Sequence, residues 1–578
     1  MAPKLSTAQD HEPRARYSLA DRFYYLNNFQ TVLAALATRY ADLLSIEEQQ
    51  FLADFDGLPK ASRALLVRMV MRKGELFRAS RLNYPEIGAP SAAVAPLVDL
   101  RWVDDRPSLD IDQLQRLLRK AELVQYFRLS RLFGRLNKPD LVEMLRVQHP
   151  MAKPFRTWCR ESSDCVYQLT VASLCERFRL MFFGNFHQDW TDFVLTDLGL
   201  FVYEKIPYSS QSRPFSSRAH IDAFQQLSLC RQHLDAGVAL NQVMEAMPLP
   251  LTDSEWLEDQ RQKLLFEIAR AYERSGDHDS ALAVLTECTH RGARLRRIRL
   301  LGRAHEWEIA RDLCLAALQN PENEAEGEQM SRLVPRLNRK LGVAVKGSRT
   351  PPKVPAFEIV VDRSNKEAAV EYCVRDYLAR QDRGNTAVHY VENGLVKSLF
   401  GLLCWRAIFA PIPGAFFHDF QYGPADLSSG QFYQRRHREF AECFAELESN
   451  QYRATIRHCF SAKAGIQSPF VTWRLLSTEL LDWALTCIPA AHLRLWFEWI
   501  SRDTENRAGF PDLVQFWPLQ QRYRMIEVKG PGDRLQDNQR RLLEFCASHQ
   551  MPVSVCYVRW AESGHVGEPA KSLASGNR

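Results

Sequence analysis

The chain reads RAGFPDLVQF at residues 507–516 and YRMIEVKG at residues 523–530, and these two runs decide the fold of its carboxyl-terminal third. Both runs are rich in β-branched and aromatic residues, and a short polar break separates them, so they predict a β-hairpin. Side chains alternate between the two faces of a strand. We therefore expect Glu527 and Lys529 on one face, with Ile526 and Val528 on the other face, in the core.

Two carboxylates are expected to meet at one end of this hairpin. Asp512 opens the first strand, so its carboxylate can approach Glu527 across the strand pair. Converging carboxylates form a hard-oxygen site that suits Mg²⁺ or Mn²⁺. The apolar residues between 535 and 546 recur at helical spacing, and 553–558 reads as a further strand. The predicted order is therefore strand, strand, helix, strand.

A third carboxylate, Glu392, lies upstream in a segment that predicts a helix beginning near Asn385 and Thr386. Its neighbours at i+4, i+7 and i+11 are apolar, namely Val396, Leu399 and Leu403. An ionised glutamate buried on such a stripe is costly unless a cation lies beside it. Three interpretations stay open: a metal ion, a buried arginine partner, or a position at the wet edge of the stripe.

Length and composition indicate a multidomain globular protein. The 578 residues suggest about three to five domains. Apolar residues make up 46% of the chain and charged residues 25%, which excludes collagenous and wholly disordered classes. The 13 cysteines include no C-x-x-C pair, so a reducing compartment is expected rather than a disulfide framework or a zinc ribbon. We expect no signal peptide and no membrane span.

The first two thirds of the chain predict helices. Apolar residues recur at helical spacing from Tyr17 to about Leu82, and helices resume after an N-cap sequence at 108–110. Residues 264–321 contain a weak internal repeat of small and large residues, typical of tetratricopeptide helix pairs, with a generic helical bundle as the alternative. The segment 345–355 combines glycine, prolines and cations without periodicity, which predicts a linker.

Positive charge gathers in two clusters, although the net charge is only +6. Dense arginine clusters bind phosphates with little sequence selectivity, so nucleic acid is the expected partner, with solvated helix faces as the alternative. The candidate DNA-binding residues are Arg116, Arg119, Lys120, Arg128, Arg131, Arg135 and Lys138 in the first cluster, and Arg291, Arg294, Arg296 and Arg297 in the second. Residues 134–145 resemble the end of a SAP helix-loop-helix module.

The hairpin also has the spacing of the PD-(D/E)-x-K nuclease pattern, a Pro-Asp, 14 intervening residues and then Glu-x-Lys. NRAGFPDLVQF and RMIEVKGPGDRLQDNQRRLLEF resemble the virus-type replication-repair nuclease (VRR-NUC) domain. Further upstream, YYLNNFQTVL, VRMVMRKGELFRASRLNYPEI and VENGLVKSLFGLLCWRAIF extend a resemblance to Fanconi-associated nucleases over most of the chain. No cysteine precedes Cys159, so the ubiquitin-binding zinc finger of longer eukaryotic members is expected to be absent, as in a bacterial form.

This resemblance implies a mostly α-helical first two thirds followed by an α/β PD-(D/E)xK nuclease core. The domains that it implies are an amino-terminal helical domain at 15–99, a SAP-like DNA-binding region at 100–210, TPR-like helical repeats at 215–345, a linker at 346–356 and a VRR-NUC nuclease domain at 357–562, with its core at about 450–562.

The resemblance also implies roles for individual residues. Asp512, Glu527 and Glu392 would be metal ligands, and Val528 would lend its carbonyl oxygen. Lys529 would orient the attacking water or help to deprotonate it. Three supporting residues match the family near the motif, with the first two expected to hold phosphate: Arg534, Gln539 and Arg507.

The implied function is a structure-selective, metal-dependent DNA nuclease, with 5′-flap endonuclease and 5′-to-3′ exonuclease activities. Such an enzyme would use one or two Mg²⁺ or Mn²⁺ ions, act on branched or 5′-flap DNA, and serve DNA repair, including interstrand crosslink repair. It would be intracellular, in the bacterial cytoplasm or nucleoid, or in a eukaryotic nucleus. Two alternatives stay open, as does the oligomeric state: a Holliday-junction resolvase-like nuclease, and a non-catalytic scaffold that binds branched DNA.

Overall fold

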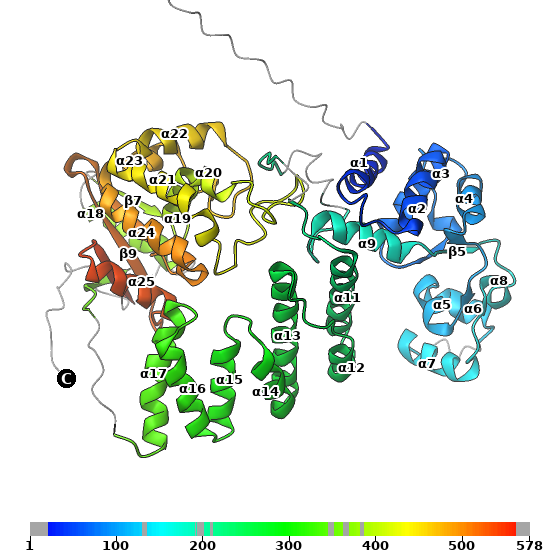
Figure 1. Cartoon of the computed structure of the whole chain (residues 1–578), viewed down its shortest axis with the longest axis horizontal. Coiled ribbons are helices and arrows are strands. Elements are labelled where there is room, and N and C mark those ends of the chain that lie inside the picture. The colour runs from blue at the N-terminus through cyan, green and yellow to red at the C-terminus, as the bar shows by residue number, and fades with distance from the viewer. Residues whose placement is uncertain are drawn as a thin grey trace, which may run out of the picture. The chain divides into compact units, whose positions relative to one another are not determined.

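The protein was analysed as a computed structural model, which describes residues 21–129, 136–190, 192, 201–207, 212–344, 352–361, 369–381 and 386–561. The chain divides into two compact units, Met1–Val202 with Arg213–Ser228, and Tyr203–Ser212 with Leu229–Arg578 (Figure 1). No helix among the described residues is both long enough and apolar enough to cross a membrane. The predicted fold class is confirmed: helices dominate the first part of the chain, and a mixed sheet appears in the carboxyl-terminal part.

The first unit opens with helices packed beside a small antiparallel sheet. The sheet has the order β1-β5-β2, built from Leu76–Arg78, Val166–Leu169 and Val103–Asp104. Ser45 caps α2 by accepting from the amide of Glu48, whose side chain accepts in return from the Ser45 amide. The helices around this sheet are α1 (Tyr24–Arg39), α2 (Ile46–Gly57), α3 (Lys60–Val70), α4 (Pro90–Asp99) and α9 (Ala172–Phe183).

The predicted resumption of helices after residue 108 is confirmed, with Asp110 as the N-cap of the first one. A separate apolar core forms here, in which Leu114, Leu141 and Leu145 are fully buried. Arg78 joins this core to the sheet through ion pairs with Glu122 and Asp164. The elements are α5 (Ile111–Leu117), α6 (Lys120–Tyr126), α7 (Lys138–Gln148), α8 (Phe155–Trp158) and a two-stranded sheet of β3 (Ser108–Leu109) and β4 (Lys153–Pro154).

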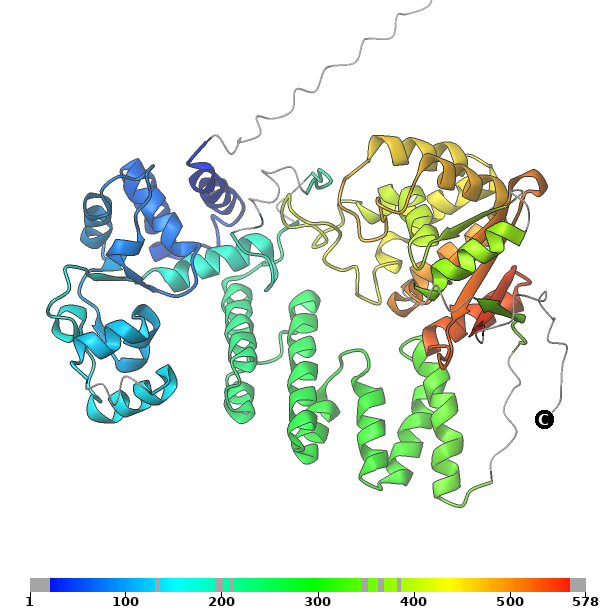
Figure 2. The ribbon, with the colours of Figure 1, turned by 180° about the vertical axis from the view of Figure 1, so that it is seen from behind.

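The second unit begins with the predicted helical hairpins, which lie side by side in Figure 1 and are seen from behind in Figure 2. The helices are α12 (Leu240–Glu245), α13 (Glu255–Ser275), α14 (His278–Glu287), α15 (Ala293–Arg303), α16 (Trp307–Gln319) and α17 (Glu324–Lys340). The division between the units falls within α11 (Arg218–Asp235). Ala269, Ala281 and Ala310, the small residues of the repeat, are fully buried where neighbouring helices approach. The helical-hairpin interpretation is therefore confirmed.

The hairpin array contacts the rest of its unit through arginines. Arg332 on α17 donates to Asp537, the first residue of α25 (Asp537–Ser548), at 2.6 Å. Arg291, which precedes α15, donates to the hydroxyl of Thr504 at 2.8 Å. These contacts join the array to both ends of the segment that contains the predicted hairpin.

A five-stranded sheet of order β6-β10-β9-β8-β7 forms the carboxyl-terminal part of the second unit. β8 and β9 make the predicted hairpin, and β10 returns parallel to β9, so the predicted order of strand, strand, helix and strand is confirmed. The strands are β6 (Ala356–Val361), β7 (Ala387–Tyr390), β8 (Leu513–Trp517), β9 (Arg522–Lys529) and β10 (Val553–Trp560).

The two faces of this sheet belong to different apolar clusters. Leu513, Ile526 and Val528 pack against α18 (Val370–Gln381), whereas Val514 and Met525 join a large helical cluster on the opposite face. By strand alternation, Asp512, Glu527 and Lys529 lie on the face of the large cluster. The helices of that cluster are α19 (Leu395–Leu403), α20 (Trp405–Ile408), α21 (His437–Glu448), α22 (Tyr452–Ala462), α23 (Thr478–Cys487), α24 (Ala490–Arg502) and α25.

The predicted start of the helix around Glu392 is wrong. Residues Ala387–Tyr390 pair with β8 as an antiparallel edge strand, and Glu392 lies in the turn before α19, which begins at Leu395. The apolar stripe at i+4, i+7 and i+11 from Glu392 belongs to α19 alone. Glu392 is exposed, because the strand and the turn hold it outside the helical stripe. The helical spacing of the apolar residues was correct for α19. The predicted helix was wrong because it extended backward over residues that form β7.

Candidate active site

Asp512 and Glu527 face each other where the β8–β9 hairpin meets the turn after β7. The register pairs Leu513 with Ile526, so the next step along the ladder brings Asp512 opposite Glu527. The carboxylate of Asp512 accepts a hydrogen bond from the Val528 amide at 2.8 Å. Asp512 is 8% exposed and Glu527 is fully buried. The hairpin therefore brings together the two carboxylates that the sequence predicted.

Pro511 lies just before the paired part of β8. Pro511 and Val528 each lie two residues beyond the last pair of this ladder, Leu513 with Ile526. Leu513 and Ile526 direct their amide and carbonyl groups toward each other, because the Asp512 carbonyl instead accepts from the β7 side. Val528 has the same phase as Ile526, so its amide and carbonyl both point toward β8. Proline has no N–H, so the ladder offers the Val528 carbonyl no donor from Pro511.

Lys529 is the cation of this group. Its Nζ lies 2.8 Å from Oε1 of Glu527, on the same face of β9. Burial, reinforced by the charge of Asp512, raises the pKa of Glu527 to about 7, although Lys529 acts in the opposite direction. Burial also raises the pKa of Asp512 to about 6. One ammonium therefore does not compensate the two buried carboxylates.

The backbone holds Glu392 beside Asp512. The amides of Val391 and Glu392 both donate to the carbonyl oxygen of Asp512, at 2.8 and 3.2 Å. The Glu392 carboxylate accepts a hydrogen bond from the Tyr390 hydroxyl. Asn393 adopts a left-handed conformation with φ of 49°, and its side chain accepts from the Phe510 amide at 3.0 Å. The turn after β7 is thus fastened to the segment that precedes β8.

The donor set fits a hard divalent cation. Neither carboxylate oxygen of the buried Glu527 accepts a hydrogen bond from a described residue, apart from the close approach of Lys529. A buried, unsatisfied carboxylate is costly unless a cation compensates it. In the described part of the chain, however, no three side chains of His, Cys, Asp or Glu are already gathered closely enough to hold an ion. Glu392 is exposed and hydrogen-bonded to Tyr390, so its side chain would have to rotate to join Asp512 and Glu527.

The three predicted supporting residues have different environments. Arg507 is largely buried, where burial lowers its pKa to about 10, and it donates to the Leu427 carbonyl at 2.8 Å. Arg534 is exposed in the loop between β9 and α25. Gln539 accepts from the Gln536 amide at 2.9 Å and so caps the start of α25. Gly509 has φ of +93°, and a Cβ atom there would lie 2.7 Å from the Asn538 carbonyl carbon. Only a glycine at position 509 therefore allows the start of α25 to pack this closely against the segment before β8.

Two residues near the site were not predicted from the sequence. Tyr390 contacts Glu392 directly, and Glu371 lies in the first turn of α18, close enough to Asp512 to raise the pKa of that carboxyl group further. The only signal for Tyr390 was its spacing of two residues from Glu392. Glu371 had no motif around it, because its proximity depends on how α18 packs on the sheet.

The first basic cluster is mixed in its environment. Arg116 and Arg119 are exposed and have no ion pair among the described residues, and Lys120 is partly exposed. Arg128 pairs with Glu161 at 2.7 Å. Lys138 donates to the carbonyls of Gln115 and Leu118, which close the end of α5. Arg131 and Arg135 lie outside the described residues.

In the second basic cluster, carboxylates of the same unit already neutralise much of the charge. Arg294 donates to Glu326 at 2.9 Å, and Arg296 pairs with Glu273. Arg291 has Asp503 within 3.4 Å in addition to its contact with Thr504. Arg297 is partly buried and has no ion pair among the described residues. The charge available to a DNA backbone is therefore smaller than the sequence of α15 suggests.

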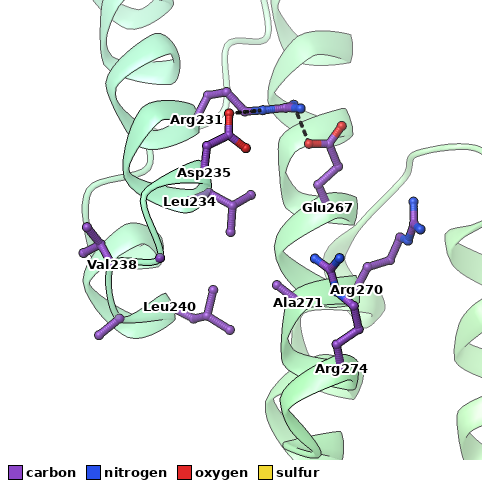
Figure 3. Close-up of a pocket in the computed structure, with 11 residues that line it drawn as sticks. Arg231, Leu234, Asp235, Val238, Leu240, Glu267, Arg270, Ala271 and Arg274 are labelled. Atoms are coloured by element: carbon purple, nitrogen blue, oxygen red, sulfur yellow. Dashed lines mark hydrogen bonds and ion pairs between the residues drawn. The ribbon is translucent and has the colours of Figure 1, made fainter.

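A groove between α11 and α13 contains further cations that were not predicted from the sequence (Figure 3). Arg231 bridges the two helices through ion pairs with Asp235 and Glu267. Arg270 and Arg274 lie one helical turn apart on α13, are exposed, and have no ion pair among the described residues. Their i,i+4 spacing was a visible signal, but acidic residues nearby in the sequence obscured it.

Comparisons with known proteins agree with this organisation. Three domain families match the chain: the "FAN1, HTH domain" at residues 23–104, the "Fanconi anemia-associated nuclease SAP domain" at 108–158 and the "VRR-NUC domain" at 447–560. The chain is 49% identical to the Fanconi-associated nuclease 1 homolog of Pseudomonas aeruginosa over 544 residues, which cover 94% of this chain and 97% of that protein. It is 24% identical to the homolog from Arabidopsis thaliana over 93% of this chain and 67% of that protein.

Two solved structures also resemble the chain over most of its length. The chain superimposes with a TM-score of 0.88 and 50% identity on a crystal structure of paFAN1 bound to 2-nucleotide 5′-flap DNA with a gap. The match covers 94% of this chain and 99% of that chain. A second crystal structure, of paFAN1 with a 1-nucleotide 5′-flap DNA, matches with the same TM-score of 0.88 and 49% identity.

Proposed function

The chain belongs to the Fanconi-associated nuclease family, and from that premise we propose that it is a divalent-metal-dependent phosphodiesterase that cuts DNA at 5′ flaps and degrades DNA from 5′ ends. One observation carries this proposal: Asp512, Glu527 and Lys529 share one face of the hairpin, and Glu392 is hydrogen-bonded through its backbone to Asp512. The similarity to paFAN1, whose crystal structures contain 5′-flap DNA, supports the choice of substrate.

In this proposal, Glu392, Asp512 and Glu527 hold Mg²⁺ or Mn²⁺, and the Val528 carbonyl adds a neutral oxygen. A bound divalent ion lowers the pKa of an attacking water and offsets charge on the reacting phosphate. Lys529 supplies a fixed ammonium beside the same phosphate and stabilises negative charge as it develops. Arg534 is exposed in the loop after the hairpin, which suits a group that holds the DNA backbone, and Arg507 supports the site from the segment before the hairpin. Gln539 supports the site by capping α25.

We also propose that the chain binds DNA through the cations of both clusters, and that the domain division expected from the sequence describes its working parts. Arg116, Arg119 and Lys120 form no ion pair with a described carboxylate, which supports a role in phosphate contacts. Repair of DNA, including interstrand crosslinks, follows from the family. An intracellular location, in the bacterial cytoplasm or nucleoid, is supported by the 13 cysteines, all of which are free thiols.

The test compares wild type with Asp512→Asn on a labelled 5′-flap duplex in Mg²⁺. Asparagine keeps the size of the side chain but removes a charged ligand, which should cost several kcal/mol of transition-state stabilisation, or a rate loss of about 10³-fold. Flap binding should remain, because the basic clusters are unchanged. Asp419→Asn, which alters an exposed carboxylate of the same unit, is the matched control and should cut at the wild-type rate.

Three results distinguish the alternatives. Cleavage of the flap that stops with EDTA supports the proposal, whereas equal cutting by wild type and Asp512→Asn contradicts the assigned site. Symmetric cuts in a four-way junction, in preference to the flap, would identify a resolvase. Tight flap binding without any cleavage in Mg²⁺ or Mn²⁺ would identify a non-catalytic scaffold.

A further inference from the structure

A pocket lies at the turn end of the β8–β9 hairpin, on the face of the sheet that packs against α18. Its volume is about 320 Å³. The strand register pairs Gln515 with Arg524. Two residues nearer the turn, it pairs Trp517 with Arg522. Because side chains alternate along a strand, these two pairs lie side by side on one face of the sheet and form one wall of the pocket.

Direct contacts hold both cross-strand pairs. Arg524 donates to Oε1 of Gln515 at 2.8 Å, and Gln515 is only 2% exposed. The guanidinium carbon of Arg522 lies 4.3 Å from the centre of the Trp517 ring. Arg522 is exposed and forms no ion pair with any described residue. The pocket therefore combines a buried amide with an exposed guanidinium that is stacked on an aromatic ring.

The carboxyl-terminal end of α18 supplies the opposite wall, through Leu378 and Gln381. Leu378 is buried in the apolar cluster on this face of the sheet. Gln381 is exposed, and its Nε2 donates to the Tyr377 hydroxyl at 2.8 Å. The Oε1 atom of Gln381 accepts no hydrogen bond from a described residue, so it is available to a ligand as an acceptor.

The charge of the pocket is positive. The described residues that line it include two arginines and no acidic residue. Both guanidinium carbons lie near the same ring, with that of Arg522 at 4.3 Å and that of Arg524 at 5.9 Å from the centre of Trp517. Two like charges this close repel each other, and an anion between them would relieve the repulsion. The pocket is therefore suited to an anion that also has a flat ring.

We propose that this pocket binds a nucleotide, that is, a planar base that carries a phosphate. A phosphate monoester has about two negative charges at pH 7, which balance the two guanidinium groups, and the planar fork of arginine suits phosphate oxygens. The base stacks on the plane of Arg522 or on Trp517. Gln381 accepts from an exocyclic amine, which favours adenine or cytosine. Ligand pockets usually have about 300–1,000 Å³, so this one has room for a single nucleotide.

This pocket is separate from the carboxylates of the candidate active site. Glu527 and Lys529 lie on the opposite face of β9. Along the strand, Glu527 is about 17 Å from Arg522, at roughly 3.4 Å per residue. The proposal therefore goes beyond the proposed function, since it needs neither a divalent cation nor cleavage. Its ligand has two possible sources, a free mononucleotide and a nucleotide of a DNA strand.

Stacked arginines and cross-strand pairs also stabilise a sheet that binds no ligand, so the variants must report on binding. Arg522→Ala removes the exposed guanidinium, and Arg522→Lys keeps the charge without the planar fork. Arg559→Ala is the matched control, because Arg559 is an exposed arginine of the same sheet, on β10, and pairs with Glu358. Asp512→Asn tests whether the nucleotide binds at the candidate active site instead. Circular dichroism checks that each variant is folded.

The experiment titrates the full chain in EDTA with deoxyadenosine monophosphate, deoxyadenosine and inorganic phosphate, by isothermal titration calorimetry. Wild type should bind the monophosphate at one site, and each of the two fragments at least about 10-fold more weakly, because each lacks one half of the interaction. Arg522→Ala should weaken binding of the monophosphate about 10- to 100-fold, as the loss of a charged hydrogen bond predicts. Arg522→Lys should fall between the two. Arg559→Ala and Asp512→Asn should bind like wild type.

Several results overturn the site. These are no binding of the monophosphate to wild type at millimolar concentration, equal affinity in wild type and Arg522→Ala, and loss of binding in Asp512→Asn. Inorganic phosphate that binds as tightly as the monophosphate also overturns it, because the pocket would then select no base. A short strand of deoxyadenylates identifies the source: competition with the monophosphate in wild type indicates a DNA strand, and its absence indicates a free nucleotide. Both of these outcomes support a nucleotide site.

Discussion

Replacing Glu527 by glutamine should stabilise the cation-free protein at alkaline pH, although it should abolish activity. The carboxyl group is fully buried, and its pKa is raised from 4.5 to about 7, chiefly by burial and then by the charge of Asp512. At about 1.36 kcal/mol for each pKa unit, this difference corresponds to about 3 kcal/mol of unfavourable free energy when the folded protein loses the proton. Glutamine mimics the protonated form, so it removes this penalty.

The sign follows from the pKa in each state. Below about pH 4.5 the carboxyl group is protonated in both the folded and the unfolded chain, so wild type carries no penalty. As the pH rises toward 7, the unfolded chain ionises first and the wild type loses stability relative to the variant. Above pH 7 the loss reaches its full value. The variant should therefore gain little at pH 5 and most at pH 8.

Differential scanning calorimetry in EDTA measures this gain. At about 2 °C per kcal/mol for a large domain, about 3 kcal/mol should raise the melting temperature by about 6 °C at pH 8. Adding Mg²⁺ should raise the melting temperature of wild type and leave the variant nearly unchanged, because only wild type keeps the full ligand set. Glu505→Gln, at an exposed carboxylate, is the control. An equal or lower melting temperature for Glu527→Gln at pH 8 would refute the reasoning.

Three other variants test separate parts of the second and first units. Gly509→Ala should destabilise the protein by about 1–3 kcal/mol more than Gly532→Ala in thermal unfolding, because both glycines have positive φ but only Gly509 lies against the start of α25; equal losses would contradict this. Asp426→Asn should cost about 3–5 kcal/mol, because Arg436 is fully buried and donates to both carboxylate oxygens of Asp426 at 2.8 and 2.9 Å; urea unfolding at pH 7 measures the loss, and an unchanged midpoint speaks against the pair. Alanine at both Arg116 and Arg119 should lower the slope of log affinity against log salt by about 2 for flap DNA. Alanine at Arg146, which is paired with Asp112 and Glu143, should change the slope less, and a slope equal to wild type for the double variant removes these residues from the interface.

Local patterns predicted most of the hairpin and its chemistry. Period-two alternation placed Glu527 and Lys529 on one face of the second strand. Because one short turn joins the two strands, the register of that turn was enough to predict that Asp512 lies close to Glu527. Helical spacing likewise identified Ala269, Ala281 and Ala310 as buried contacts of the array. These features depend on residues that are near one another in sequence, so they can be read without a structure.

Features that depend on distant packing could not be read in this way. Glu392 was assigned to a helix because α19 follows immediately and its apolar stripe projects backward over β7. β7 has only four residues, so AVHY gave a weak signal beside that helix. Glu371 reaches the site only because α18 packs on the sheet, and the pairing of Arg294 with Glu326 depends on how α15 meets α17.

Pro511 shows how a residue at the end of a strand pair can withhold a backbone hydrogen-bond donor. Pro511 has no hydrogen on its nitrogen, so it cannot donate to a carbonyl of β9, and the Val528 amide donates to the carboxylate of Asp512. If the Val528 carbonyl binds the proposed cation, Pro511 would help by withholding a competing hydrogen-bond donor, while Asp512 holds the neighbouring amide.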